Sequence, residues 1–195
     1  MREIGLPFWL AGGVGSRAGL DSALAAGAAG IQVGTLFAYC DESGLAPLLK
    51  SRVLAAVVDG TVSLRTDPRA SPTGYPFKVV ELPGDDERAT ERKRLCDLGY
   101  LRVPIRTSDG RTLYRCSAEP VDAYVSKGGS IADTVGRRCL CNGLTANIGQ
   151  AQWRPEENSA EIPLVTSGDD LLSLAESATT NASYTAAQVV RHLCQ

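Results

Sequence analysis

The chain has 195 residues, 44% of them hydrophobic, which is enough to bury the core of one ordinary domain or of one domain with a smaller second unit. Its 20 lysine and arginine residues are balanced by 22 aspartate and glutamate residues, so we expect neither nucleic acid nor an anionic membrane as a partner. No apolar run reaches the roughly 18 to 20 residues of a membrane-spanning helix, and glycines interrupt the opening residues too early for a signal-peptide core, so we expect a cytoplasmic protein.

The first part of the chain predicts a parallel strand–helix–strand unit. Residues 7–11 (PFWLA) form an apolar run that is typical of a short strand buried on both faces. Over residues 16–26 apolar side chains recur at helical spacing, with Ser16 as a candidate N-cap and Gly27 as a candidate stop. Residues 29–33 (AGIQV) predict the second strand, and connections this short favour parallel pairing.

The following segments predict a helix and then a less regular region. Residues 45–56 place apolar side chains on one face of a helix, with Pro47 in its first turns. Residues 60–82 contain three prolines and a turn signal, so we expect an ordered excursion that ends in a strand over residues 77–82. Residues 83–95 form a charged run that is typical of a solvated helix or loop.

The C-terminal part predicts two short helices. LLSLAESA follows Ser167, Gly168 and two aspartates, and YTAAQVVRHL follows Ser183, so both have N-terminal cap signals. We interpret Asp169 and Asp170 as a charged first helical turn rather than as an acid/base pair. The two tryptophans, Trp9 and Trp153, are predicted to be packing residues of the core.

Two glycine-containing turns follow the two predicted parallel strands. Gly12 and Gly13 come after the first strand, and Gly34 and Thr35 come after the second. Glycines after a strand offer backbone N–H donors and room for a phosphate, and a helix that begins nearby adds its positive dipole end. In eight-stranded βα barrels a common phosphate site lies in the loops after the seventh and eighth strands. The pattern favours one phosphate site formed by both turns, although such turns also serve backbone geometry alone.

Several stretches carry a resemblance to a known family. The segments AGGVGSRAGLDSALAAGAAGIQVGTLF, ESGLAPLLKSRVL and RTDPRASPTGYPFKVVEL resemble the C-terminal part of the nitronate monooxygenase family, formerly called 2-nitropropane dioxygenases. The segments LCDLGYLR, YRCSAEPVDAYV, RRCLCNGL and PLVTSGDDL are similar to a bacterial branch of that family. The resemblance therefore runs over nearly the whole chain.

The resemblance implies an FMN-dependent βα barrel that oxidises alkyl nitronates with molecular oxygen. In the family, a glycine pair and a Gln-x-Gly-Thr motif hold the flavin phosphate. Carried over to this sequence, the implied FMN-binding residues are Gly12, Gly13, Gln32, Val33, Gly34 and Thr35. The implied small-molecule partners are a nitronate-type substrate and O2.

The resemblance also implies that part of the barrel is absent, because the chain begins at what resembles the seventh strand. In the family, earlier strands supply the rest of the flavin site and a catalytic histidine, and we assign no catalytic residue here. The sole histidine, His192, lies in the last turn of a predicted terminal helix, where a helix-end or surface role is expected. We expect the chain alone to be weakly active at best, and to pair with the missing N-terminal portion of the barrel or with a second copy.

The six cysteines are expected to be reduced thiols rather than a disulfide framework. Four of them, Cys96, Cys116, Cys139 and Cys141, fall in the least interpretable third of the chain. Their spacing lacks the C-x₂₋₄-C pairs of common zinc modules, so we assign no metal site and interpret them as thiols of a folded insert.

These observations predict an α/β protein: the last βα units of a partial FMN-type (βα)8 TIM barrel, a cysteine-containing insert and C-terminal helices. The predicted parts are residues 1–82, 83–152 and 153–195. The predicted function is FMN-dependent nitronate oxidation. Two alternatives stay open: another phosphate-binding barrel of the purine-nucleotide dehydrogenase kind, and a non-catalytic half that contributes its phosphate loops to a separate N-terminal chain.

Overall fold

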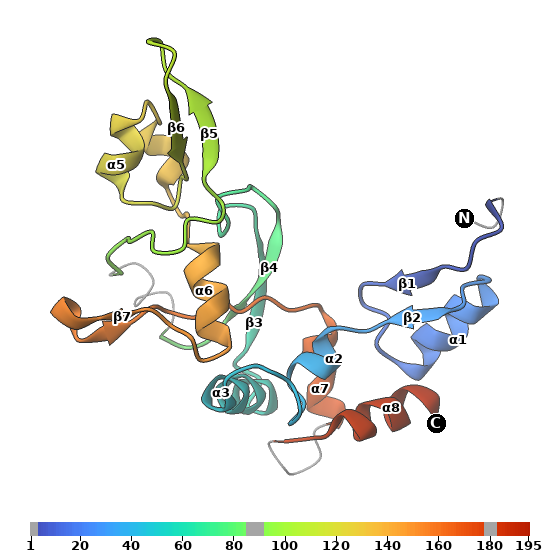
Figure 1. Ribbon diagram of the computed structural model, residues 1–195. Helices are drawn as coiled ribbons and strands as arrows, with labels where there is room; N and C mark the ends of the chain where they lie inside the picture. Colours follow the sequence, from blue (N-terminus) through green and yellow to red (C-terminus); the bar gives the residue numbers. More distant parts are fainter. Residues whose placement is uncertain (1–3, 85–91, 178–182) are drawn as a thin grey trace. The chain divides into compact units, whose positions relative to one another are not determined.

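The computed structural model describes residues 4–84, 92–177 and 183–195, which belong to two compact units. Unit 1 combines the chain up to Val62 with the C-terminal segment Ser167–Gln195, and unit 2 is Ser63–Thr166. Figure 1 shows the helices and strands of each unit, coloured along the sequence. The predicted division of the chain at residues 82 and 152 stays a prediction.

Unit 1 contains two strands and five helices within the described residues. In chain order they are β1 (Trp9–Ala11), α1 (Arg17–Ala25), β2 (Gly30–Gln32), α2 (Thr35–Ala38), α3 (Pro47–Val58), α7 (Asp170–Ser177) and α8 (Ala186–Cys194). Strands β1 and β2 pair in parallel, with Trp9 opposite Gly30 and Ala11 opposite Gln32. The predicted parallel strand–helix–strand unit is thereby confirmed.

Helix α1 begins and ends where its sequence predicts. The Oγ of Ser16 accepts a hydrogen bond from the N–H of Gly19 at 3.0 Å, which satisfies one of the free donors of the first turn. At the other end Gly27 adopts a φ of 83°, a left-handed conformation that glycine takes without a steric penalty. The helix is therefore held to nine residues, short enough to return the chain alongside β1.

The expectation that β1 is buried on both faces is wrong. All three of its residues are exposed, and the Trp9 side chain keeps 58% of its surface accessible. The described strands form four separate two-stranded sheets, so that β1 and β2 have no further strand beside them and no closed barrel is present among the described residues. A two-stranded pair leaves much of its apolar surface uncovered, which explains the exposure of Trp9.

The core of unit 1 is instead helical. Val53 of α3 and Leu171 of α7 are fully buried, and α7 packs against both α2 and α3. The phenol of Tyr184 donates to the carbonyl of Leu36 at 2.7 Å, which ties the segment before α8 to α2. Helix α8 is capped by Thr185 and not by Ser183, because Thr185 forms a complete capping box at the helix start.

Unit 2 is built from three antiparallel strand pairs and short helices. Its elements are β3 (Ser63–Asp67), β4 (Phe77–Glu81), β5 (Val103–Arg106), β6 (Thr112–Arg115), α5 (Val121–Ser126), η2 (Ile131–Thr134), α6 (Leu140–Asn147), β7 (Trp153–Arg154), η3 (Pro155–Glu157) and β8 (Ser159–Ala160). The pairs are β3 with β4, β5 with β6, and β7 with β8. Strand β4 matches the strand predicted near residues 77–82, whereas most of the charged run 83–95 lies outside the described residues.

The apolar core of unit 2 is small and is supplemented by buried ion pairs. Leu140 and Leu164 pack with Ala70 and Val79, and partly buried Phe77 and Leu101 cover them. Trp153 does not contribute to this core: its side chain is 57% exposed on the short strand β7, so the expectation of a packing role is wrong. A strand of two residues offers too little surface to bury so large a ring.

No helix among residues 4–84, 92–177 and 183–195 has the length and apolar character needed to cross a membrane. This finding agrees with the hydropathy of the sequence.

The neighbouring leucines Leu171 and Leu172 test the helical core of unit 1. Leu171 is fully buried and Leu172 is 50% exposed. We expect Leu171→Ala to lower the free energy of unfolding by about 2–5 kcal/mol, because it removes buried methyl groups and leaves a cavity. Leu172→Ala should change it by about 0.5 kcal/mol or less. Urea unfolding followed by circular dichroism measures both, and equal losses in the two variants would contradict the assigned packing.

Candidate phosphate-binding turns and a cysteine-lined cavity

The two glycine-containing turns lie at the same edge of the parallel strand pair. Ala11 is the last residue of β1 and lies opposite Gln32, the last residue of β2. Because the strands are parallel, the residues that follow them, beginning with Gly12 and Val33, leave the sheet side by side. The structure therefore brings together the two turns that the sequence singles out.

The backbone of the first turn requires glycine. Gly12 and Gly13 have φ values of 87° and 69°, in the left-handed region where a side chain is strained. A Cβ at either residue would meet nothing within 4 Å, as would one at Gly34, so the space beside these three residues is open. This combination of exposed backbone and free space suits the approach of an anion.

A third segment, residues 168–170 at the start of α7, contacts Thr35 of the second turn and lies beside Gly15, which follows the first turn. The N–H of Gly168 donates to the Oγ1 of Thr35 at 2.9 Å. A Cβ placed on Gly15, which follows the first turn, would lie 2.6 Å from the Oδ2 of Asp170. The sequence marks this segment only as a helix start. No local pattern shows that it packs against residues more than 130 positions away.

The turns offer backbone hydrogen-bond donors rather than charged side chains. The six predicted residues, Gly12, Gly13, Gln32, Val33, Gly34 and Thr35, include no ionisable side chain. The carboxylate of Asp170 lies close to Gly15, and the nearby Arg17 is engaged by Asp21 at 3.1 Å and by the carbonyl of Cys194 at 2.6 Å. An anion bound here would depend on backbone N–H groups and on the start of α1 rather than on an ion pair.

Two titratable side chains of unit 1, those of Tyr39 and His192, lie outside the turns. Burial raises the pKa of Tyr39, which follows α2, so that its phenol stays protonated at neutral pH. His192 lies in the last turn of α8 and is exposed, as the sequence predicts. That the chain supplies no catalytic residue, and that the turns bind FMN, both stay predictions.

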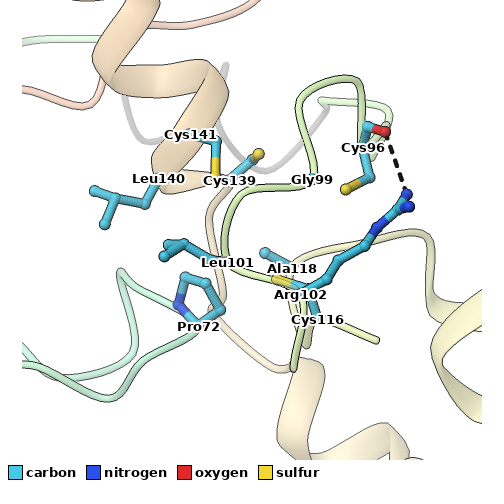
Figure 2. Close-up of a pocket in the computed structure, with 10 residues that line it drawn as sticks. All are labelled: Pro72, Cys96, Gly99, Leu101, Arg102, Cys116, Ala118, Cys139, Leu140 and Cys141. Atoms are coloured by element: carbon cyan, nitrogen blue, oxygen red, sulfur yellow. Dashed lines mark hydrogen bonds between the residues drawn. The ribbon is translucent and has the colours of Figure 1, made fainter. Parts of the chain in front are cut away.

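The structure gathers the four central cysteines around one cavity in unit 2. Cys96 precedes β5, Cys116 follows β6, and Cys139 and Cys141 lie at the start of α6 (Figure 2). All four are free thiols, as the sequence predicts. Burial raises the pKa of Cys116 and raises that of Cys139 to about 11, so that these two are protonated at neutral pH. Their common cavity was not predicted.

Comparison with known proteins bears on the first part of the chain. Residues 3–70 match the model of a protein family described as nitronate monooxygenase, which confirms the resemblance over about a third of the sequence. The match includes both glycine-containing turns, β1, β2 and the intervening helix. Neither a search of curated proteins nor a search of solved structures found a match.

The contact between Thr35 and Gly168 provides a test of how the turns are held. Thr35→Val removes the oxygen that accepts from the Gly168 N–H while keeping the shape of the side chain. We expect it to lower the free energy of unfolding by about 0.5–1.5 kcal/mol and to speed hydrogen exchange at the Gly168 amide. Thr35→Ser keeps the acceptor and should leave that amide protected. Unchanged exchange in Thr35→Val would show that the contact is dispensable.

Proposed function

We propose that the chain is the phosphate-binding part of an FMN-dependent oxidoreductase that oxidises alkyl nitronates with O2. The family match over residues 3–70 carries this proposal, because it spans the two turns that the parallel β1–β2 pairing places together. The match supports an oxidoreductase of the nitronate monooxygenase kind. The family match does not specify the cofactor, the substrate or the location. We propose that these are FMN, an alkyl nitronate and the cytoplasm.

The residues at the turns fit the phosphate end of FMN. Backbone N–H groups of Gly12 and Gly13 would hold phosphate oxygens from one side, and those of Val33, Gly34 and Thr35 from the other. The open space beside Gly12, Gly13 and Gly34 supports this assignment, since a Cβ there would meet nothing within 4 Å. When bound, FMN supplies the electron-transfer chemistry of the reaction. The chain's own contribution is to bind and orient the phosphate without a charged side chain.

We further propose that additional strands cover the β1–β2 pair in the active protein. The exposure of Trp9 at 58% and of Leu24 at 49% supports this, because large apolar side chains on a paired strand and its covering helix are usually buried in a barrel. The covering strands would come from the rest of the barrel or from a second copy of the chain. They would also bring the catalytic base, for which no candidate stands among the described residues of unit 1.

A cytoplasmic location is part of the same proposal. The six cysteines are all free thiols, including the exposed Cys194. Reduced thiols are the rule in the cytosol, whereas oxidising compartments favour disulfides.

Two glycines of unit 1 allow a matched test of the phosphate assignment. Gly34 and Gly44 are both exposed, have no strained backbone, and leave open space where a Cβ would stand. We expect Gly34→Asp to weaken FMN binding at least about tenfold, because its carboxylate would oppose the phosphate, whereas Gly44→Asp should bind as the unchanged chain does. Quenching of flavin fluorescence on titration measures both affinities.

Riboflavin, which lacks the phosphate, completes this test. The unchanged chain should bind FMN more tightly than riboflavin, and Gly34→Asp should remove that preference. If FMN and riboflavin bind equally well, or if FMN does not bind, the turns do not hold a flavin phosphate. Preferential binding of a purine nucleotide would favour the dehydrogenase-like alternative.

Oxygen consumption distinguishes an active enzyme from a binding half. We expect little nitronate-dependent oxygen uptake by the chain alone, because two strands do not close a barrel. Rapid uptake by the isolated chain with FMN would contradict the proposal that further strands are needed. Activity that appears only on mixing with a separate N-terminal chain would support the half-module alternative.

A further inference from the structure

The four cysteines of unit 2 surround a cavity that suits a single small ion. The cavity has about 10 Å³ of room for a water-sized sphere, which is about the minimum that one water molecule needs. An organic substrate or a flavin does not fit such a space. Among the described residues that line it, Arg102 has the one polar side chain apart from the four thiols (Figure 2). The described side chains of the cavity wall therefore offer sulfur atoms, and no oxygen atom, as metal ligands.

Three separate segments bring the thiols to this cavity, although they are far apart in the sequence. The antiparallel pairing of Val103 with Arg115 closes the β5–β6 hairpin, and Cys96 and Cys116 lie on the two sides of that hairpin. Cys139 is the N-cap residue of α6, and Cys141 lies in the first turn of that helix. Two sulfurs thus come from the segments on either side of a hairpin and two from a helix start.

Hydrogen bonds next to the cysteines brace two of these segments against each other. Asp97, the neighbour of Cys96, accepts from the side-chain amide of Asn142 at 2.6 Å, and Asn142 is the neighbour of Cys141. The guanidinium of Arg154 also donates to Asp97, at 3.0 Å and 2.8 Å. The Cys96 loop and the start of α6 are therefore held together by side chains that directly follow two of the thiols.

The third segment is braced by a buried carboxylate. Glu119, which follows Cys116 by three residues, is 1% exposed and accepts from Lys127 at 3.0 Å and 2.8 Å. Arg102 lies 3.9 Å from the same carboxylate and donates to the carbonyl of Cys96 at 3.5 Å. Arg102 thus links the Cys96 loop to the turn after Cys116, and its positive charge lies at the edge of the cavity.

We propose that Cys96, Cys116, Cys139 and Cys141 bind one zinc ion as a structural tetrathiolate site. Four S–H bonds are broken and four Zn–S bonds form, the four protons pass to solvent, and no atom changes its oxidation state. Sulfur ligands select a soft metal over Mg²⁺ or Ca²⁺, and a closed set of four leaves no position for a substrate. The positive charge of Arg102 offsets part of the negative charge of such a centre.

Binding requires the sulfurs to turn inward from their present positions. Among the described residues, no group of three or more His, Cys, Asp or Glu side chains already has the spacing of a metal centre. A cysteine side chain can rotate between staggered conformations, and such a rotation moves the sulfur while the backbone stays in place. The four cysteines lie in unit 2, beyond residues 3–70 that match the family model, and the proposal is independent of the flavin function.

Metal analysis and cobalt substitution test the site on the full chain. We expect about one zinc per chain by mass spectrometry of the metal content. Cobalt(II) exchanged into the protein should show the thiolate charge-transfer and visible absorption bands of tetrahedral sulfur ligation. Absence of stoichiometric zinc together with absence of these bands would overturn the proposal. So would iron with acid-labile sulfide, or disulfides among the four cysteines.

Alkylation of the unchanged chain locates the ligands without a variant that risks unfolding. With zinc present, Cys96, Cys116, Cys139 and Cys141 should react much more slowly with N-ethylmaleimide than after chelation, whereas exposed Cys194 should react in both states. Cys139→Ser should lose most of the zinc, and the control Cys194→Ser should keep it. Equal labelling of the four thiols with and without zinc, or loss of zinc in Cys194→Ser, would contradict the assignment.

Discussion

The parallel register of β1 and β2 is the constraint on which the candidate flavin site depends. Because Ala11 lies opposite Gln32, both strands end at the same level and both following turns begin there. The nine-residue helix α1 makes this register possible, since its cap at Ser16 and its stop at Gly27 limit how far the chain travels before it returns. Had the same residues formed an antiparallel hairpin, the glycine turns would lie at opposite ends of the pair.

A two-stranded parallel pair has little stability of its own, so the turns must be anchored by other elements. In unit 1 that anchor is helical. Thr35 begins α2 and accepts from the Gly168 N–H, and the following helix α7 buries Leu171 against its neighbours. The chain thus returns from its C-terminal part to support an edge formed by its first residues. This contact explains how the turns keep their positions at the end of a sheet with only two described strands.

Local patterns in the sequence predict the elements whose determinants are local. Ser16 and Gly27 bound a helix through contacts within a few residues, and the apolar runs around it predict the two strands. The exposure of Trp9 and of Trp153 was not predictable in this way, because burial depends on which other elements cover a side chain. The contact of Gly168 with the second turn was likewise hidden, since it joins residues separated by most of the chain.

The cavity shared by the four cysteines was also not predictable from local sequence patterns. A zinc module is recognised from sequence when two ligands lie on one tight turn, and of the four only Cys139 and Cys141 are close in sequence. A hairpin separates Cys96 from Cys116, and two short helical segments separate Cys116 from Cys139. The sequence spacing of the four cysteines therefore depends on the lengths of the elements between them, and it does not indicate that the four side chains line one cavity.

A charged network in unit 2, formed by Asp97 with the buried residues Arg154 and Glu161, explains the bracing around these cysteines. Asp97 is partly exposed, and its partial desolvation opposes ionisation, but hydrogen bonds from Arg154 and Asn142 outweigh that effect and lower its pKa. Buried ion pairs recover little more free energy than their desolvation costs, so they add less to stability than apolar packing of the same volume. These ion pairs instead fix the relative positions of the segments that they join. In a unit whose apolar core is small, a charged network beside two cysteines serves to hold the cysteine-bearing loop on the start of α6, which is the arrangement that a shared ligand needs.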